Sequence, residues 1–126
     1  MKRLWIALAL LAFLLASTLA NSFYLTRIID GYELRLSTAQ ALAAQGVWTN
    51  ASQLTQQVFH DWESRSFYFH ILIRHTDTDA IHLAFREVQE YLILQETDQY
   101  TAANARLITQ LSLLAEMEQL TLENVF

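Results

Sequence analysis

Residues 4–26 read LWIALALLAFLLASTLANSFYLT, a run of 23 residues that contains no charged side chain. Lys2 and Arg3 precede this run, and the whole chain contains no proline to interrupt a helix. At about 1.5 Å of rise per residue, a helix of this length crosses a hydrocarbon core of roughly 30 Å. The stretch therefore predicts a helix that spans a membrane or directs the chain through one.

The rest of the chain has the composition of a small all-α domain. The 126 residues include two glycines, and 53% are hydrophobic. A β-sandwich or barrel needs many turns, where glycine and proline collect. About 100 residues remain beyond the apolar run, enough for one core. We predict a cytoplasmic N-terminus at 1–3, a transmembrane signal-anchor at 4–25 that continues into an antiparallel up-down four-helix bundle, and an extracytoplasmic bundle domain at 26–126.

The apolar run also fits a cleaved signal peptide. A short positive region precedes it, and small residues allow cleavage after Ala20. Apolar and helical character continues past that point, and Phe23 and Tyr24 suit the outer membrane interface. We favour an uncleaved, single-pass anchor in the cell membrane, with the N-terminus in the cytoplasm as the positive-inside rule indicates.

The net charge limits the classes of partner that we expect, and the cysteine content limits the chemistry. The formal net charge is −5, and without Lys2 and Arg3 it becomes −7. A nucleic-acid binder needs a basic stripe, so we expect no nucleic-acid partner. An anionic membrane surface would repel this acidic domain, which leaves the N-terminal helix as the expected membrane contact. The chain has no cysteine, which excludes disulfides and thiolate chemistry.

Apolar side chains recur at steps of three and four through four segments, the period of a buried helix face. The predicted inward faces are Leu25, Ile29, Tyr32, Leu36, Ala39 and Ala43; Leu54, Val58, Trp62, Phe69 and Ile73; Ile81, Ala84, Phe85, Val88, Tyr91 and Leu92; and Tyr100, Ala103, Leu107, Leu111 and Leu114.

Four features predict where these helices begin and end. Gly46 can adopt a left-handed conformation that ends the first helix. Asn50 then resembles an N-cap, with Gln53 three residues later. Residues 76–79 read TDTD, a predicted corner, and residues 97–98 mark another break and cap.

Several spaced residues resemble those of a known family. They are Trp48 after a glycine, a central Trp62, His75 before an acidic segment, the pattern Ile81…Phe85…Val88…Tyr91-Leu92, and LENVF at residues 122–126. With the basic start and one apolar helix, these residues resemble the bacterial family catalogued as domain of unknown function 4363, small membrane-anchored helical proteins of Firmicutes. The resemblance covers nearly the whole chain. It implies anchoring and a helical fold, and it carries over no catalytic residue.

One stretch has the composition of a metal site. His75, Asp77, Asp79 and His82 supply the imidazole and carboxylate ligands that suit zinc or another transition metal. The alternative is that the two aspartates favour the start of a helix through its dipole. We prefer this second interpretation and expect no metal and no cofactor.

No arrangement of residues predicts catalysis. The serines lie in helical segments without a glycine-rich turn or a base at a suitable spacing. The paired carboxylates Glu87 and Glu90 fall on a solvated face, whereas a catalytic acid usually needs burial to shift its pKa. We therefore expect the protein not to be an enzyme.

Two apolar clusters remain as candidate partner surfaces. Residues 67–69 read FYF, and because neighbours on a helix point about 100° apart, at least one ring must face a second surface. The segment 116–126 is predicted as a tail with an apolar end, which packs on the bundle or docks on a partner. The candidate surface residues are Phe67, Tyr68, Leu122 and Phe126. We expect protein–protein contact in an envelope complex or a homo-oligomer; the alternative is a bundle that binds or senses a small molecule or a metal.

Overall fold

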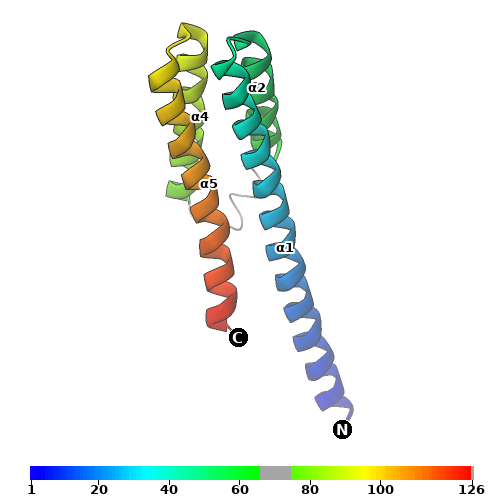
Figure 1. Cartoon of the computed structure of the whole chain (residues 1–126). Coiled ribbons are helices and arrows are strands. Elements are labelled where there is room, and N and C mark those ends of the chain that lie inside the picture. The colour runs from blue at the N-terminus through cyan, green and yellow to red at the C-terminus, as the bar shows by residue number, and fades with distance from the viewer. Residues whose placement is uncertain (66–74, 126) are drawn as a thin grey trace.

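The computed structural model describes residues 1–65 and 75–125, and within them the side chains of 1–65 and 78–117 (Figure 1). The described residues form four helices and no strand: α1 (Lys2–Ala44), α2 (Trp48–Ser64), α4 (His75–Leu94) and α5 (Thr97–Val125). This confirms the predicted all-α class.

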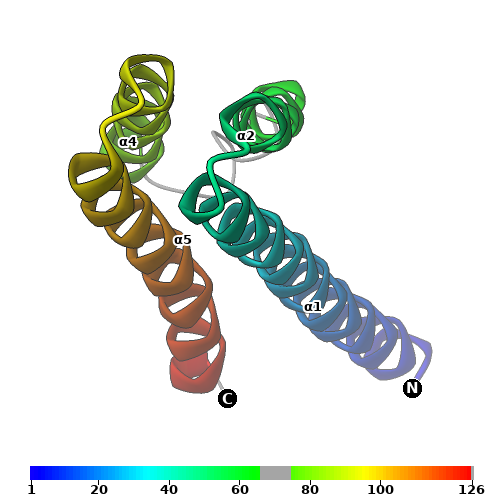
Figure 2. The ribbon, with the colours of Figure 1, turned by 45° about the horizontal axis from the view of Figure 1, so that its top comes forward.

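The helices form two antiparallel hairpins that pack side by side. α1 packs on α2 and α5, and α4 packs on α5 and α2, so the four helices occupy the corners of a square bundle in up-down order. Both hairpin connections lie at one end, which we call the turn end (Figures 1 and 2). α5 and the apolar part of α1 extend from the opposite end, the terminal end (Figure 1). The predicted four-helix bundle is confirmed.

The buried core follows the predicted apolar faces closely. All six predicted positions of α1 and all five of α5 are buried, as are Val58 and Trp62 of α2. Leu54, Ala84 and Tyr91 are half-buried and pack against this core. The predicted positions Phe69 and Ile73 lie outside the described residues.

One buried polar residue links the two longest helices. Asn104 of α5 is fully buried, and its Nδ2 donates to the Leu36 carbonyl oxygen at 3.1 Å and to Oε1 of Gln40 at 2.9 Å. These bonds set α5 against α1 at one position along their axes.

Both hairpin turns use the same helix-ending motif. At Gly46 (φ +82°), the amide of Val47 donates to the Leu42 carbonyl, and the Gly46 amide donates to Ala43. This is a Schellman motif, in which a left-handed residue satisfies the last carbonyls of a helix. The second turn repeats it with Gln95 (φ 55°) in the left-handed position. The prediction for Gly46 is confirmed.

Two predicted helix starts are wrong by a few residues. α2 begins at Trp48 with Val47 as N-cap and no side-chain cap, so Asn50 lies within the first turn. The chain turns directly from the Schellman motif into α2, which leaves no room for a later cap. α4 begins at His75, so residues 76–79 form its first turn rather than a corner before it.

The predicted tail is part of a helix. α5 continues without a break to Val125, although the apolar pattern weakens after Ala115. Leu122 therefore belongs to α5, and Phe126 lies outside the described residues.

The first part of α1 has no cover within the structure. Its apolar side chains are exposed except for the half-buried Leu15, and the first buried position is Ser22. Among the described helices α1 is the one long and apolar enough to cross a membrane, by length and composition, and none of that apolar window is buried.

Candidate functional site

The predicted site residues are only partly described. Phe67 and Tyr68 lie outside the described residues, and the side chains of His75, Asp77 and Leu122 are likewise not described. Asp79 is exposed. His82 is half-buried, and its ring packs 5.3 Å from the ring of Phe59. Within the described ranges no three histidine or acidic side chains gather as a metal site would require.

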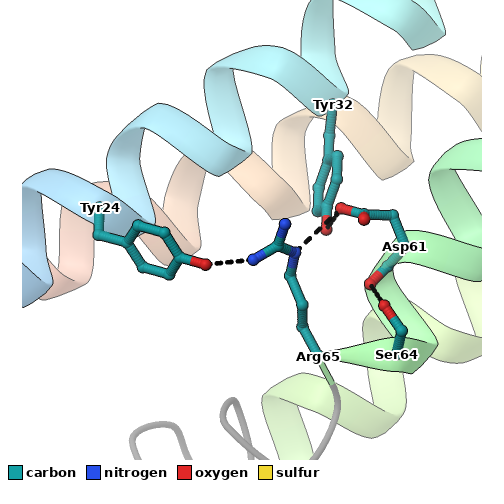
Figure 3. A network of polar contacts seen from close by, with 5 residues as sticks. All are labelled: Tyr24, Tyr32, Asp61, Ser64 and Arg65. Carbon is teal, nitrogen blue, oxygen red and sulfur yellow. Dashed lines mark hydrogen bonds and ion pairs between the residues drawn. The ribbon is translucent and has the colours of Figure 1, made fainter.

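A polar network joins α1 to α2 near the terminal end of the bundle (Figure 3). Tyr32 of α1 donates its hydroxyl hydrogen to Oδ2 of Asp61 on α2 at 2.5 Å. Nε of Arg65, one turn further along α2, donates to the same oxygen at 3.1 Å. Nη1 of Arg65 donates to the hydroxyl of Tyr24, and the guanidinium lies 5.7 Å from the centre of that ring. Arg65 thus connects the Asp61 carboxylate to Tyr24, near the C-terminal end of the apolar run.

The network holds Asp61 as a carboxylate. Burial alone would raise the pKa of Asp61, but the hydrogen bonds from Tyr32 and Arg65 and the positive charges of Arg65 and Arg35 bring it below its usual value. Burial and the bond to Asp61 raise the pKa of Tyr32 far above 10. Asp61 therefore stays ionised and Tyr32 stays neutral across the physiological pH range.

Asp61 also lines an open polar groove of about 710 Å³ between α1 and α2. Because the hydrogen bonds from Tyr32 and Arg65 both end on Oδ2, Oδ1 of Asp61 makes no hydrogen bond among the described residues and remains an available acceptor. The other lining residues are polar and exposed: Arg35, Gln53, Gln56, Gln57, His60 and Ser64.

Exposed apolar side chains gather at the turn end. Ile93 and Leu94, in the last turn of α4, are 75% and 56% exposed, and Val47 is 36% exposed. Trp48 and Ile93 line one shallow pocket, which brings the start of α2 beside the end of α4. The Trp48 ring packs edge-on against Tyr100 of α5, with ring centres 6.0 Å apart. We call Val47, Trp48, Ile93 and Leu94 the apolar tip.

Sequence reasoning missed both the network and the apolar tip. Asp61 and Arg65 stand four residues apart, the spacing of an ion pair on a helix face, so half of the network was visible in the sequence. Tyr32 was predicted as a core residue, which is correct for its ring. The partners Tyr24 and Tyr32 come from another helix, and no local pattern identifies them.

The fold defines a helical bundle whose first helix extends into an exposed apolar segment. Residues 19–125 match the family described as Domain of unknown function (DUF4363), and the chain belongs to this family. The family named from the sequence is confirmed for residues 19–125. Neither the curated proteins nor the solved structures that were compared include a match to the chain.

Proposed function

We propose that this protein is a single-pass membrane protein whose bundle lies outside the cytoplasm and acts, without catalysis, by binding another protein through the apolar tip. The observation that carries the proposal is the exposure of Ile93, Leu94 and Val47 at the turn end, where Ile93 and Trp48 line one pocket, opposite the apolar segment of α1. Exposed apolar patches of this kind usually mark interaction surfaces.

The apolar segment supports anchoring. A bilayer would cover the exposed side chains before Ser22, and Lys2 and Arg3 favour a cytoplasmic N-terminus. α1 also runs through Ala20 without a break, which favours an uncleaved helix over a signal peptide. In this orientation the apolar tip points away from the membrane.

The charges around the apolar tip indicate the chemistry of the partner. Residues 36–59 contain no charged side chain, and residues 87–105 contain four acids and no lysine or arginine. Glu96 and Asp98, next to the tip, are exposed. Such a surface fits an apolar patch rimmed by lysine or arginine. Two copies meeting tip to tip would place acids against acids, so the proposal favours a different protein as partner.

Two measurements test the anchor. Alkaline phosphatase fused after Phe126 should be active in a bacterial host, because the enzyme folds only outside the cytoplasm. Intact-mass analysis of the purified protein should show the N-terminal residues. A mature chain beginning at Asn21 would overturn the anchor.

A matched pair of substitutions tests the apolar tip. Ile93→Asp should abolish co-purification of a stoichiometric partner from cross-linked membranes of the cell that makes the protein. Leu34→Asp is the control, since Leu34 is also highly exposed but lies on α1 away from the tip. Circular dichroism should show both variants folded. Retention of the same partner by Ile93→Asp, or its loss from both variants, would contradict the proposal.

A further inference from the structure

The groove between α1 and α2 has the composition of a binding site for hydroxyl-rich molecules. It presents a carboxylate, a guanidinium, an imidazole, three side-chain amides and a hydroxyl, contributed by two helices. A sugar hydroxyl both donates and accepts hydrogen bonds, and amide side chains offer both functions in one group. Charged donors and acceptors form the stronger bonds.

Two hydrogen bonds fix the Asp61 carboxylate that lines the groove. Tyr32 and Arg65 both bind Oδ2 of Asp61, which fixes the side chain and leaves Oδ1 for a ligand (Figure 3). Ser64 donates its hydroxyl hydrogen to the backbone oxygen of Asp61 at 2.8 Å, so its oxygen is also presented as an acceptor. Asp61 and Ser64 thus give the groove two acceptors of fixed orientation.

The donors are the other exposed side chains that line the groove. Arg35 is exposed, and its charge helps to lower the pKa of Asp61 without a close ion pair between the two, so its guanidinium hydrogens are available to a ligand. Gln53, Gln56 and Gln57 are exposed on α2. From Gln53 to Ser64 the helix rises about 16 Å, a length that suits a chain of sugar units better than a single one.

We propose that this groove binds an uncharged oligosaccharide. The two charged side chains among the lining residues, Arg35 and Asp61, have opposite signs, so the lining itself carries no net charge and favours an uncharged ligand. The lining glutamines Gln53, Gln56 and Gln57 provide an extended set of paired donors and acceptors. This inference goes beyond the proposed protein contact, because the groove is a separate surface from the apolar tip.

Titration of the full-length protein in nanodiscs tests the proposal, with binding followed by calorimetry. The probes are the trimer of N-acetylglucosamine, maltotriose, triglycine and inorganic phosphate. At least one trisaccharide should bind, and Gln56→Ala and Arg35→Gln should each weaken that binding at least fivefold. Both side chains are exposed, so neither change should disturb the fold. The control variants are Gln99→Ala and Arg86→Gln, whose exposed side chains lie outside the groove.

Each other outcome overturns the proposal. Binding of triglycine or phosphate without a saccharide would show a peptide or anion site instead. Absence of binding by every probe at millimolar concentration would show that the groove is only a solvated surface. Equal weakening in the groove and control variants would place any saccharide contact elsewhere on the protein.

Discussion

The hydroxyl of Tyr32 lies 2.5 Å from Oδ2 of Asp61, and this hydrogen bond joins α1 to α2. The ring of Tyr32 is buried in the core, while Asp61 reaches the surface groove. The same tyrosine therefore serves the packing of the bundle through its ring and the orientation of a surface carboxylate through its hydroxyl.

Replacing Tyr32 with phenylalanine separates these two roles. Tyr32→Phe keeps the buried ring and removes the bond to a charged acceptor, which should lower the free energy of unfolding by about 1–3 kcal/mol. Denaturant titration of the full chain in detergent micelles measures the change. Tyr91→Phe is the control, because Tyr91 is half-buried and no hydrogen bond of its hydroxyl is described. Equal losses in the two variants would show that the bond to Asp61 adds no stability.

Asp61 should make the stability of the bundle fall in acid. Its pKa is lower in the folded chain than in the unfolded chain, where it is about 3.9. The ionised carboxylate therefore stabilises the fold above pH 4, and this contribution is lost as the pH falls through the folded-state pKa. Asp61→Asn should lower stability at pH 7 and weaken its dependence on pH between 5 and 2. The control is Glu90→Gln, which removes an exposed carboxylate in the interior of α4, and equal losses of stability in the two variants would show that the bonds to Asp61 are not the cause.

Gln95 is a site where glycine should stabilise the protein. Its φ of 55° is left-handed, a conformation that costs a non-glycine residue roughly 1–2 kcal/mol. Gln95→Gly removes this strain and should raise the unfolding free energy. The gain should be only about 0.5–1 kcal/mol, because the greater freedom of glycine in the unfolded chain offsets part of it. The reciprocal variant Gly46→Ala should lower it by about 1 kcal/mol. A thermal midpoint that drops in Gln95→Gly would mean that the glutamine side chain stabilises the turn.

Trp62 should be an anchor of the core. It is 3% exposed, and its ring centre lies 6.2 Å from that of Phe85 on α4. Trp62→Ala should lower the free energy of unfolding by roughly 3–5 kcal/mol, a large part of the stability of a typical small domain. His60→Ala, at an exposed position of the same helix, is the matched control. A thermal midpoint that hardly moves in Trp62→Ala would contradict the burial of this ring.

The sequence predicted the helical core best, because the buried apolar residues of a helix recur with its period. Each helix buries one face, so the spacing of Leu25, Ile29, Tyr32 and the residues that follow identified the core side of α1. Polar core residues such as Asn104 and Thr55 escaped prediction, because polar side chains normally indicate a solvated face. Their burial depends on which helix lies opposite.

The sites were less predictable because they form between helices. The contacts of Tyr24 and Tyr32 with Arg65 and Asp61 depend on the rotation and offset of α1 against α2, which no local pattern encodes. The left-handed Gln95 was missed for a similar reason. Glycine is the usual sign of such a turn, and here the hairpin geometry imposes the conformation on a glutamine.

Asn104 offers a final test, of how buried polarity fixes the pairing of α1 and α5. Its Nδ2 is bonded to Leu36 and Gln40, but its Oδ1 is buried without a partner. Asn104→Leu removes that unpaired acceptor and fills the space with apolar atoms. The unfolding free energy should therefore stay unchanged or rise by up to about 2 kcal/mol. Asn104→Ala leaves a cavity instead and should lower it by about 1–3 kcal/mol.

The two variants should also differ in how uniquely α5 is placed. The Asn104 bonds are satisfied at one offset of α5 against α1, whereas a leucine packs acceptably at neighbouring offsets, as polar residues in other helical assemblies suggest. Because the chain lacks cysteine, spin labels at introduced cysteines in place of Thr38 and Thr101, both exposed, can report the distance between α1 and α5. The distance distribution should be narrow in the wild type and broader in Asn104→Leu. A narrow distribution together with a loss of stability in Asn104→Leu would show that Asn104 stabilises the bundle and does not select the offset.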